Sequence, residues 1–317
     1  MKRDLILLVI LFLAGVVYPL TGTEFLAIPI MALLFVGWAT SWDILGGWAG
    51  QVSLGHVAFV GIGAYFVAVG AEHYGWAPWW SLLLAVGFSM ILALVWGALT
   101  FRLQGVYFAM STIAIAEVIR MIVINENWLS GGATGVFIIS LPTLMGFDLL
   151  NKVTQFYLAL GFAVFVLLWV IVLSRSRLGY QLRAVREDEQ SAMAAGINPL
   201  RAKLVAFVIS AMLTTLGGGV YGLYLSFMEP DVLFNLFFSI QIALTAIVGG
   251  RGTVWGPALG AIILVSASEI FRTTFAQANM LVYGVLILIV MLFLQRGILG
   301  EILYHRIRKA YANRTQG

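Results

Sequence analysis

The sequence of 317 residues contains no cysteine. Such a chain forms no disulfide, no thiolate metal site and no cysteine nucleophile. Histidine is nearly as rare: His56, His73 and His305 lie far apart, and no HExxH or paired histidine spacing exists. These absences argue against a structural or catalytic zinc site.

Charged side chains are also scarce. Only 10% of the residues are charged, 62% are hydrophobic, and the mean hydropathy is +1.00. A soluble domain has about 25% charged residues, because its surface must be solvated by water. A chain this apolar has lipid as the solvent for most of its surface, so the composition predicts an integral membrane protein.

The sequence lacks a phosphate-binding P-loop as well. That motif places a lysine directly after a glycine. None of the lysines follows a glycine; they are residues 2, 152, 203 and 309. We therefore expect no ATP-binding site of the usual kind in this chain.

Long apolar runs fill most of the chain. A membrane-spanning helix needs about 20 mostly apolar residues, and backbone polar groups in hydrocarbon must pair within the segment, which favours helices. About ten candidate spans of this kind lie near 5–20, 25–42, 55–72, 80–101, 106–124, 154–174, 203–227, 235–250, 254–271 and 279–295. We interpret the first as an uncleaved helix, with a cleaved signal peptide as the alternative. The third and ninth are rich in glycine, which leaves open whether they cross the membrane fully.

The distribution of lysine and arginine predicts the orientation of these helices, because basic residues favour the cytoplasmic side. With ten helices and a cytoplasmic N-terminus, fifteen of the eighteen basic residues fall on that side. Only Arg120, Lys152 and Arg272 fall at the outer face. The sequence thus predicts an all-α, polytopic membrane helix bundle, a single domain over 1–317 with both termini in the cytoplasm. The excess of basic residues reflects the orientation of the chain in the membrane, so no nucleic-acid partner is needed to explain it.

Two stretches lie outside the predicted spans, an outer loop at 125–153 and a cytoplasmic segment at 174–202. In the second, acidic residues from Glu187 onward begin a short helical run, which suits the helix dipole. Gly196 can cap the end of that helix. Asn198 can cap the next helix, with a proline at its first position.

The expected short helix has two to three turns, lies roughly parallel to the membrane and presents Ala192, Met193 and Ala195 beside charges. A helix of this length is not stable alone. The residues leave two interpretations open: docking into a partner protein, or an ordinary amphipathic loop at the membrane interface.

Glycine is abundant in two regions, between residues 43 and 65 and between residues 249 and 260. Glycine lets helices approach closely or unwind, and broken helices in a membrane line cavities or are buried in protein. In the first region Gln51, Ser53 and His56 are candidates for a translocation pathway. The alternative is that these groups satisfy hydrogen bonds between helices. For the second region, close helix packing is favoured over lining of a pore.

Charges inside membrane spans are costly and usually functional. Glu117 and Arg120 lie three residues apart on one face of the 106–124 span, which predicts an ion pair near the outer interface. The central helices otherwise carry almost no carboxylates. This scarcity argues against an ion-coupled secondary transporter or channel, which remains the alternative to an ATP-driven system.

Four motifs together resemble a known family. The run LRAVREDEQSAMAAGIN (182–198), followed by LRAKLVAFVISA (200–211), resembles the coupling loop of permease subunits in ABC importers of the branched-chain amino acid class. GQVSLGHVAFVGIGAY (50–65), LSGGATG (129–135) and VGGRGTVWGPALGA (248–261) are similar to further motifs of that family, in its order. The motifs extend over most of the chain, which resembles the M-type permease more than the shorter H-type.

The resemblance implies an ABC importer permease fold and assigns roles to residues of this chain. The 174–202 segment would contact an ATP-binding subunit through Glu187, Ala192, Ala195, Gly196, Ile197 and Asn198. The outer loop would be a docking surface for a periplasmic binding protein, with Trp128, Gly131 and Gly132 as its candidate residues.

The same resemblance implies the partners and the cargo. A second homologous permease, two ATP-binding subunits with their ATP and magnesium, and a periplasmic binding protein would assemble with this chain in the bacterial inner membrane. The chain itself is expected to hold no cofactor and to be no enzyme. The implied cargo is a branched-chain or related amino acid, with urea or short amides as alternatives within the family.

Overall fold

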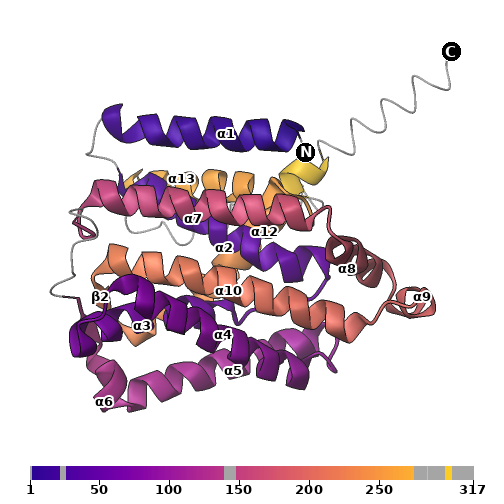
Figure 1. Ribbon diagram of the computed structural model, residues 1–317, viewed down its shortest axis with the longest axis horizontal. Coiled ribbons are helices and arrows are strands. Elements are labelled where there is room, and N and C mark those ends of the chain that lie inside the picture. The colour runs from indigo at the N-terminus through magenta and orange to yellow at the C-terminus, as the bar shows by residue number, and fades with distance from the viewer. Residues whose placement is uncertain (1, 22–25, 139–147, 275–283, 285–296, 302–317) are drawn as a thin grey trace.

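The computed structural model describes residues 2–21, 26–138, 148–274, 284 and 297–301. Most of these residues are helical, and the long helices run side by side along the longest axis of the molecule (Figure 1). The all-α bundle expected from the composition is therefore confirmed.

The described part of the bundle contains nine long helices. They are α1 (Lys2–Val17), α2 (Ala27–Asp43), α3 (His56–Tyr74), α4 (Pro78–Thr100), α5 (Val106–Asn125), α7 (Lys152–Leu173), α10 (Pro199–Leu225), α12 (Leu236–Gly250) and α13 (Gly256–Thr274). Each coincides with one of the first nine predicted spans, to within a few residues; the tenth, 279–295, lies outside the described residues. Over the described ranges, seven segments are long and apolar enough to cross a membrane. The third predicted span, α3, is among them, whereas the apolar part of the ninth, Gly256–Ser268, is shorter.

Shorter elements join these helices. They are η1 (Tyr18–Thr21), η2 (Ile44–Trp48), α6 (Asn127–Ser130), η3 (Gly132–Thr134), α8 (Arg177–Glu187), α9 (Glu189–Ala194), α11 (Pro230–Leu233) and the strands β1 (Val136–Phe137) and β2 (Phe227–Met228). The two strands pair antiparallel, Val136 with Met228 and Phe137 with Phe227. Hydropathy did not predict this small sheet. It fastens the predicted outer loop to the end of α10.

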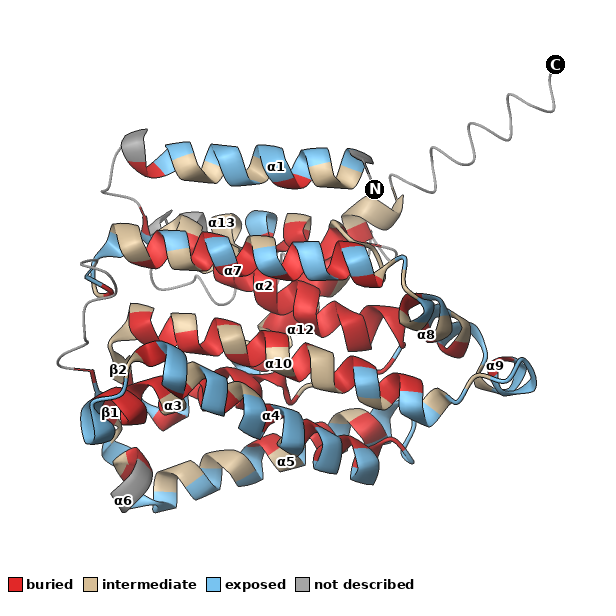
Figure 2. Ribbon diagram, in the orientation of Figure 1, coloured by how far each residue is buried: buried red, intermediate tan, exposed pale blue. Residues whose placement is uncertain are grey.

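The core of the bundle forms where α10 packs against α3, α4, α2 and α7. The contact with α3 is a contact of backbones, because a Cβ on Gly63 would overlap the carbonyl oxygen of Thr215 and one on Gly218 would overlap that of Val60. Glycine is required at such close approaches. Figure 2 shows the buried face of α10 turned toward the interior of the bundle.

The outer faces of the peripheral helices are apolar as well as exposed. On α4, Leu83, Ile91 and Leu99 are 61%, 65% and 68% exposed. Figure 2 shows the exposed residues of α1, α4 and α5 on the outside of the bundle. Patches of this kind are rare on soluble monomers. They suit a surface that is solvated by lipid.

The helix at the first glycine-rich region is broken. α2 passes into the π-helical turn η2, and the backbone then leaves the helix from Ala49 until α3 begins at His56. Gly50, with φ +74°, makes the turn that allows this exit. Ala49, Gln51, Ser53 and Gly55 of this stretch are buried and Gly50 is exposed; irregular backbone in a membrane protein is tolerated where protein covers it.

The two predicted loops lie at opposite ends of the bundle. α8 and α9 lie at one end, and α6, β1 and β2 lie at the other (Figure 1). Arg175, just after α7, pairs with Asp4 of α1 at 3.1 Å, so α1 begins at the same end as α8. This arrangement agrees with the predicted placing of the N-terminus and the 174–202 segment on one side of the membrane.

Candidate functional site

The short helix α9 is capped at its start by a side chain. Asp188 has extended backbone and accepts a hydrogen bond from the backbone N–H of Ser191 at 2.6 Å. Hydrogen bonds from Ser191 lower the pKa of the Asp188 carboxyl, because they stabilise its charged form. The helix start predicted from the acidic residues is confirmed, and Asp188 is its N-cap.

The end of α9 forms a Schellman turn. Gly196 has φ +81°, its N–H donates to the carbonyl of Met193 at 2.9 Å, and the N–H of Ile197 donates to that of Ala192 at 3.0 Å. The predicted glycine cap is therefore confirmed. Asn198 caps α10 by accepting from Arg201 N–H at 3.1 Å, with Pro199 at the first helical position. With six residues, α9 is shorter than the two to three turns expected.

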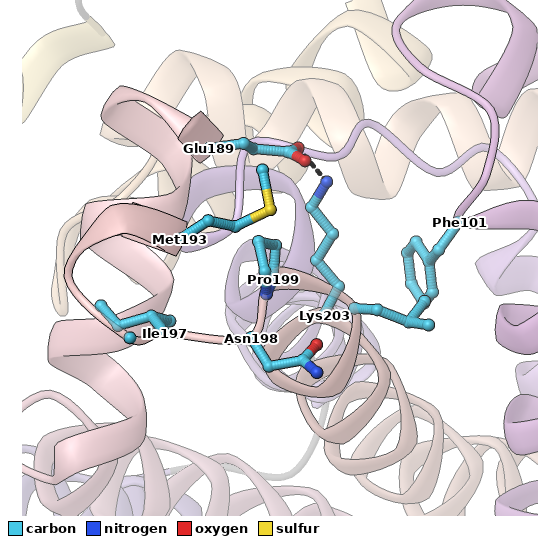
Figure 3. A pocket seen from close by; sticks show the side chains of 9 residues that line it. Phe101, Glu189, Met193, Ile197, Asn198, Pro199 and Lys203 are labelled. Carbon is cyan, nitrogen blue, oxygen red and sulfur yellow. Dashed lines mark hydrogen bonds and ion pairs between the residues drawn. The ribbon is translucent and has the colours of Figure 1, made fainter. Parts of the chain in front are cut away.

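An open groove of about 460 Å³ lies beside this turn. Its lining residues are Phe101, Glu189, Met193, Gly196, Ile197, Asn198, Pro199, Leu200 and Lys203. Figure 3 shows them converging from α9, from the start of α10 and from the end of α4. Met193 is 53% exposed and Leu200 is 45% exposed. The groove thus combines apolar side chains with a polar floor, a composition that suits protein contact.

One ion pair fixes α9 to α10. Lys203 Nζ donates to Glu189 Oε1, and Lys203 is only 3% exposed (Figure 3). A buried ammonium needs such a partner. Sequence analysis did not predict this pair. The only signal for it in the sequence is a lysine fourteen residues after a glutamate, across a helix–turn–helix.

The structure corrects one detail of the predicted segment. Ala192 is 3% exposed and faces the bundle, so it is not presented to the outside with Met193 and Ala195. Within α9, Ala192 alone is buried. Glu187 ends α8, and its side chain is 79% exposed.

The three pathway candidates of the first glycine-rich region lie in two different environments. Gln51 lines a groove of about 430 Å³ with Gln104, Asp188, Glu189 and Gln190, next to the first groove. Ser53 and His56 are fully buried. The three residues therefore do not converge on one cavity.

Hydrogen bonds between helices engage both buried candidates. His56 Nε2 lies 2.8 Å from Ser210 Oγ on α10, and His56 Nδ1 lies 3.0 Å from Ser53 Oγ. Because the Ser210 hydroxyl donates to the carbonyl of Ser41 at 2.6 Å, it accepts the proton of His56 Nε2. In a neutral imidazole, Nδ1 then accepts from Ser53. The network joins α2, the broken stretch, α3 and α10.

The outer candidates lie in a defined turn. Gly131 and Gly132 have φ +68° and +57°, and the hydroxyl of Ser130 donates to the carbonyl of Glu126 at 2.7 Å. A Cβ on Gly132 would overlap Asn127 Oδ1, so glycine is required there. Trp128 belongs to α6, and its side chain lies outside the described residues.

The predicted ion pair of α5 is confirmed. Arg120 Nε lies 3.0 Å from both carboxylate oxygens of Glu117. Asp231 of α11 joins the pair through Arg120 Nη1. The spacing along α5 predicted the first contact, but the second comes from a residue 111 positions away.

The second glycine-rich region is packed as expected. A Cβ on Gly249 of α12 would overlap the carbonyl oxygen of Gly256, and one on Gly260 of α13 would overlap that of Thr245. Close helix packing therefore explains these glycines. No local pattern indicated that the turn between these helices meets the end of α2, where Gly252 N–H donates to Asp43, 2.9 Å from each carboxylate oxygen.

The apolar exterior, together with seven described segments long enough to cross a membrane, defines a multi-pass membrane protein. The sequence model of the family described as "Branched-chain amino acid transport system / permease component" matches residues 7–292. The chain belongs to this family.

Individual relatives agree with that assignment. The chain is 30% identical to the high-affinity branched-chain amino acid transport system permease protein LivM of Escherichia coli (strain K12), over 94% of this chain and 75% of that protein. It is 29% identical to LivM of Salmonella typhimurium over the same shares. Identity to the permease protein LivH of Escherichia coli (strain K12) is 25%, over 85% of this chain and 91% of that protein. The resemblance found in the sequence is confirmed.

Proposed function

We propose that this chain is one permease subunit of an ATP-driven importer that passes branched-chain or related amino acids from a periplasmic binding protein to the cytoplasm. Its family and the names of its relatives support the cargo. The observation that carries the proposal is the turn at residues 188–198, which is capped by hydrogen bonds within the chain. Its place is the inner membrane of a bacterium.

The partners of this subunit are a second permease, two ATP-binding subunits and a binding protein. The Escherichia coli relatives LivM and LivH are each named as a permease protein of a high-affinity branched-chain amino acid transport system, which supports a pair of different permeases. ATP and magnesium belong to the ATP-binding subunits. This chain contributes a pathway and a contact surface for the motor.

The contact surface for the motor is the 189–198 turn. Ala195 and Gly196 are exposed at its tip, and no atom of the described residues lies within 4 Å of the position that a Gly196 Cβ would occupy. A partner surface can therefore approach the backbone directly. When the motor closes, α9 moves with it, and the Glu189–Lys203 pair transfers that movement to α10. α10 contacts α2, α3, α4 and α7, so the bundle responds as a whole.

The pathway follows the broken α2–α3 stretch. Gln51 lines a groove at the end that carries α9, which supports a role at the exit. Ser53 and His56 hold the shape of the stretch through their bonds to α3 and α10. In this proposal the amide of Gln51 contacts the passing amino acid, while the other two keep the backbone open.

The opposite end of the bundle receives the binding protein. The turn around Gly131 and Gly132, with Trp128, lies there and is fastened by the β1–β2 pair. A defined turn offers a fixed surface for docking, which favours recognition of a rigid partner. The positions of the basic residues support the assignment of this end to the periplasmic side.

Co-purification from native membranes tests the proposal. We expect an ATP-binding subunit to accompany the chain and uptake of leucine to require ATP. Gly196→Asp places a charged side chain at the tip of the turn and is expected to abolish both the association and the uptake. Gly75→Asp is the matched control. Gly75 also directly follows a helix, α3, has a positive φ of +61° and faces open space. Uptake that persists without ATP and follows a proton or sodium gradient would instead establish a secondary transporter.

A further inference from the structure

The last turn of α8 lies against both glycine-rich regions at once. Arg186 Nη1 donates a hydrogen bond to the carbonyl oxygen of Gly47 at 2.7 Å, across 139 positions of sequence. Gly47 belongs to η2, at the end of α2. A Cβ on Gly252, in the α12–α13 turn, would overlap Arg186 Nη1. One guanidinium therefore lies against two segments that are far apart in the sequence.

A buried carboxylate makes a second link between the same regions. Asp43 is 1% exposed and accepts from Gly252 N–H and, at 3.1 Å, from Trp48 Nε1. A buried carboxyl group persists only where donors satisfy its oxygens. Asp43 thus holds the α12–α13 turn against η2, and Arg186 adds α8 to that pair.

The junction leaves no room for side chains on Gly47 and Gly252. A Cβ on Gly47 would overlap both Asp43 Oδ1 and Gly252 N. A Cβ on Gly50 would lie 3.1 Å from Arg186 Cγ, and both Gly50 and Gly252 have positive φ angles, +74° and +76°. The backbones of two regions thus close directly on one arginine and one aspartate.

Arg186 also occupies the position where α8 passes into α9. It precedes Asp188, the N-cap of α9, by two residues. One turn earlier, the guanidinium of Arg183 lies 5.6 Å from the centre of the Trp48 ring. α8 is therefore seated on η2 at two successive turns, and α9 is its direct continuation.

We propose that Arg186 is a positioning residue for transport, passing the movement of α8 and α9 to the broken α2–α3 stretch and to the α12–α13 turn. The inference rests on the proposed function, in which a partner driven by ATP moves α9. Arg186 is bonded to Gly47, and Asp43 is bonded to Gly252. A displacement of α8 therefore carries along both the broken stretch and the α12–α13 turn. Without the guanidinium, α9 follows the motor while the broken stretch stays behind.

Arg186→Gln in the complete, reconstituted importer tests this role. Glutamine is shorter and uncharged, and it does not reach the Gly47 carbonyl in the same way. We expect the ATP-binding subunit to co-purify as with the unaltered chain, while the leucine imported per ATP hydrolysed falls by about three- to thirtyfold, the range for residues that couple two sites. Arg177→Gln is the control, because Arg177 is exposed at the start of the same helix. An unchanged ratio of uptake to hydrolysis, or a loss of assembly, would overturn the proposal.

A cysteine pair gives a second, independent test. The chain has no cysteine of its own, and a Cβ on Gly50 would lie 3.7 Å from the Cβ of Arg186, a separation that suits a disulfide. In Gly50→Cys/Arg186→Cys we expect poor coupling when reduced and recovered coupling when oxidised, because the covalent bond replaces the lost bridge. Arg186→Cys alone is the control and gains nothing from oxidation. A disulfide that forms without recovery of uptake, or one that does not form, contradicts the proposed bridge.

These outcomes separate the inference from the function on which it rests. If no ATP-binding subunit accompanies the unaltered chain, the proposed function fails. If that subunit is present and drives uptake, but Arg186→Gln couples normally, only the role of Arg186 fails.

Discussion

Glu189 and Lys203 form an ion pair that joins the first residue of α9 to the beginning of α10. The side chain of Lys203 is 3% exposed, whereas that of Glu189 is 32% exposed. The buried ammonium therefore depends on a carboxylate that water still reaches.

Removal of the carboxylate is expected to destabilise the chain. Glu189→Gln leaves the Lys203 ammonium buried without compensation, which costs about 3–5 kcal/mol for a fully buried pair. Because Glu189 is partly solvated, we expect about 1–3 kcal/mol, measured as a lower Tm of the purified chain.

Two variants control this prediction. Glu187→Gln removes a carboxylate that is 79% exposed and is expected to change the Tm little. Glu189→Gln/Lys203→Met removes both charges and is expected to regain part of the lost stability. A double variant that is less stable than Glu189→Gln would contradict the explanation.

The turn at Gly196 gives a second prediction. An L-residue with φ near +81° costs about 1–2 kcal/mol, so Gly196→Ala is expected to lower the stability of the isolated chain by about that amount. Gly161→Ala is the matched control: within the described structure a Cβ there also meets no atom within 4 Å, but Gly161 lies inside α7. Alanine favours a helix interior, so the control is expected to be neutral or stabilising. Hydrogen exchange of the 188–198 peptide would show whether the loss is local.

The Asp188 cap predicts a dependence on pH. Hydrogen bonds from Ser191 lower the pKa of Asp188 below its usual value of 3.8. A lowered pKa in the folded state means that the cap stabilises α9 above pH 3.8 and is lost as the pH falls through the folded-state pKa. We expect amide exchange in 189–194 to rise at acidic pH in the unaltered chain. Asp188→Asn keeps a capping oxygen that does not titrate, so its exchange rates at each pH serve as the reference for intrinsic amide exchange. Equal exchange rates in the two chains at every pH would refute the prediction.

The backbone contact between α3 and α10 predicts a sharp sensitivity to size. A Cβ on Gly218 would overlap the carbonyl oxygen of Val60, which cannot turn away as a side chain can. We expect Gly218→Ala to cost about 1–3 kcal/mol or more, seen as a lower yield and Tm. Gly87→Ala on α4, where the described neighbours leave open space, is expected to be tolerated.

The hydrogen bond of His56 separates a structural role from a contact with the cargo. Ser210→Ala leaves His56 Nε2 buried without its partner, at a cost of about 1–3 kcal/mol. We expect the Tm to fall while the KM for leucine stays unchanged. Gln51→Ala is expected to do the reverse, because Gln51 lines an open groove. A raised KM in Ser210→Ala at unchanged Tm would assign His56 to direct contact with the amino acid.

Hydropathy and local chemistry predicted much of this molecule. Apolar runs are long enough to identify nine described helices, and the caps at Gly196 and Asn198 follow from rules that operate over four or five residues. The pair of Glu117 and Arg120 also follows from helix periodicity. Each of these features depends on neighbours in sequence.

Contacts between distant residues were beyond such reasoning. The bond of Arg186 to Gly47 and that of His56 to Ser210 join residues 139 and 154 positions apart. Their existence depends on how whole helices are arranged, which no local pattern encodes. The prediction that Ala192 is exposed was wrong for a related reason, because the packing of α8 and α10 determines which side of α9 is covered.

The direct backbone contact of α3 and α10 has a mechanical consequence. Side chains act as compliant spacers, since a change of rotamer lets two helices slide by an ångström or so at little cost. Between Gly63 and Thr215, and between Val60 and Gly218, there is no spacer to adjust. These two helices must therefore move as one rigid body. Any opening of a passage is left to helices that meet through side chains, as α1 does where its Gly15 faces the side chain of Leu160 on α7.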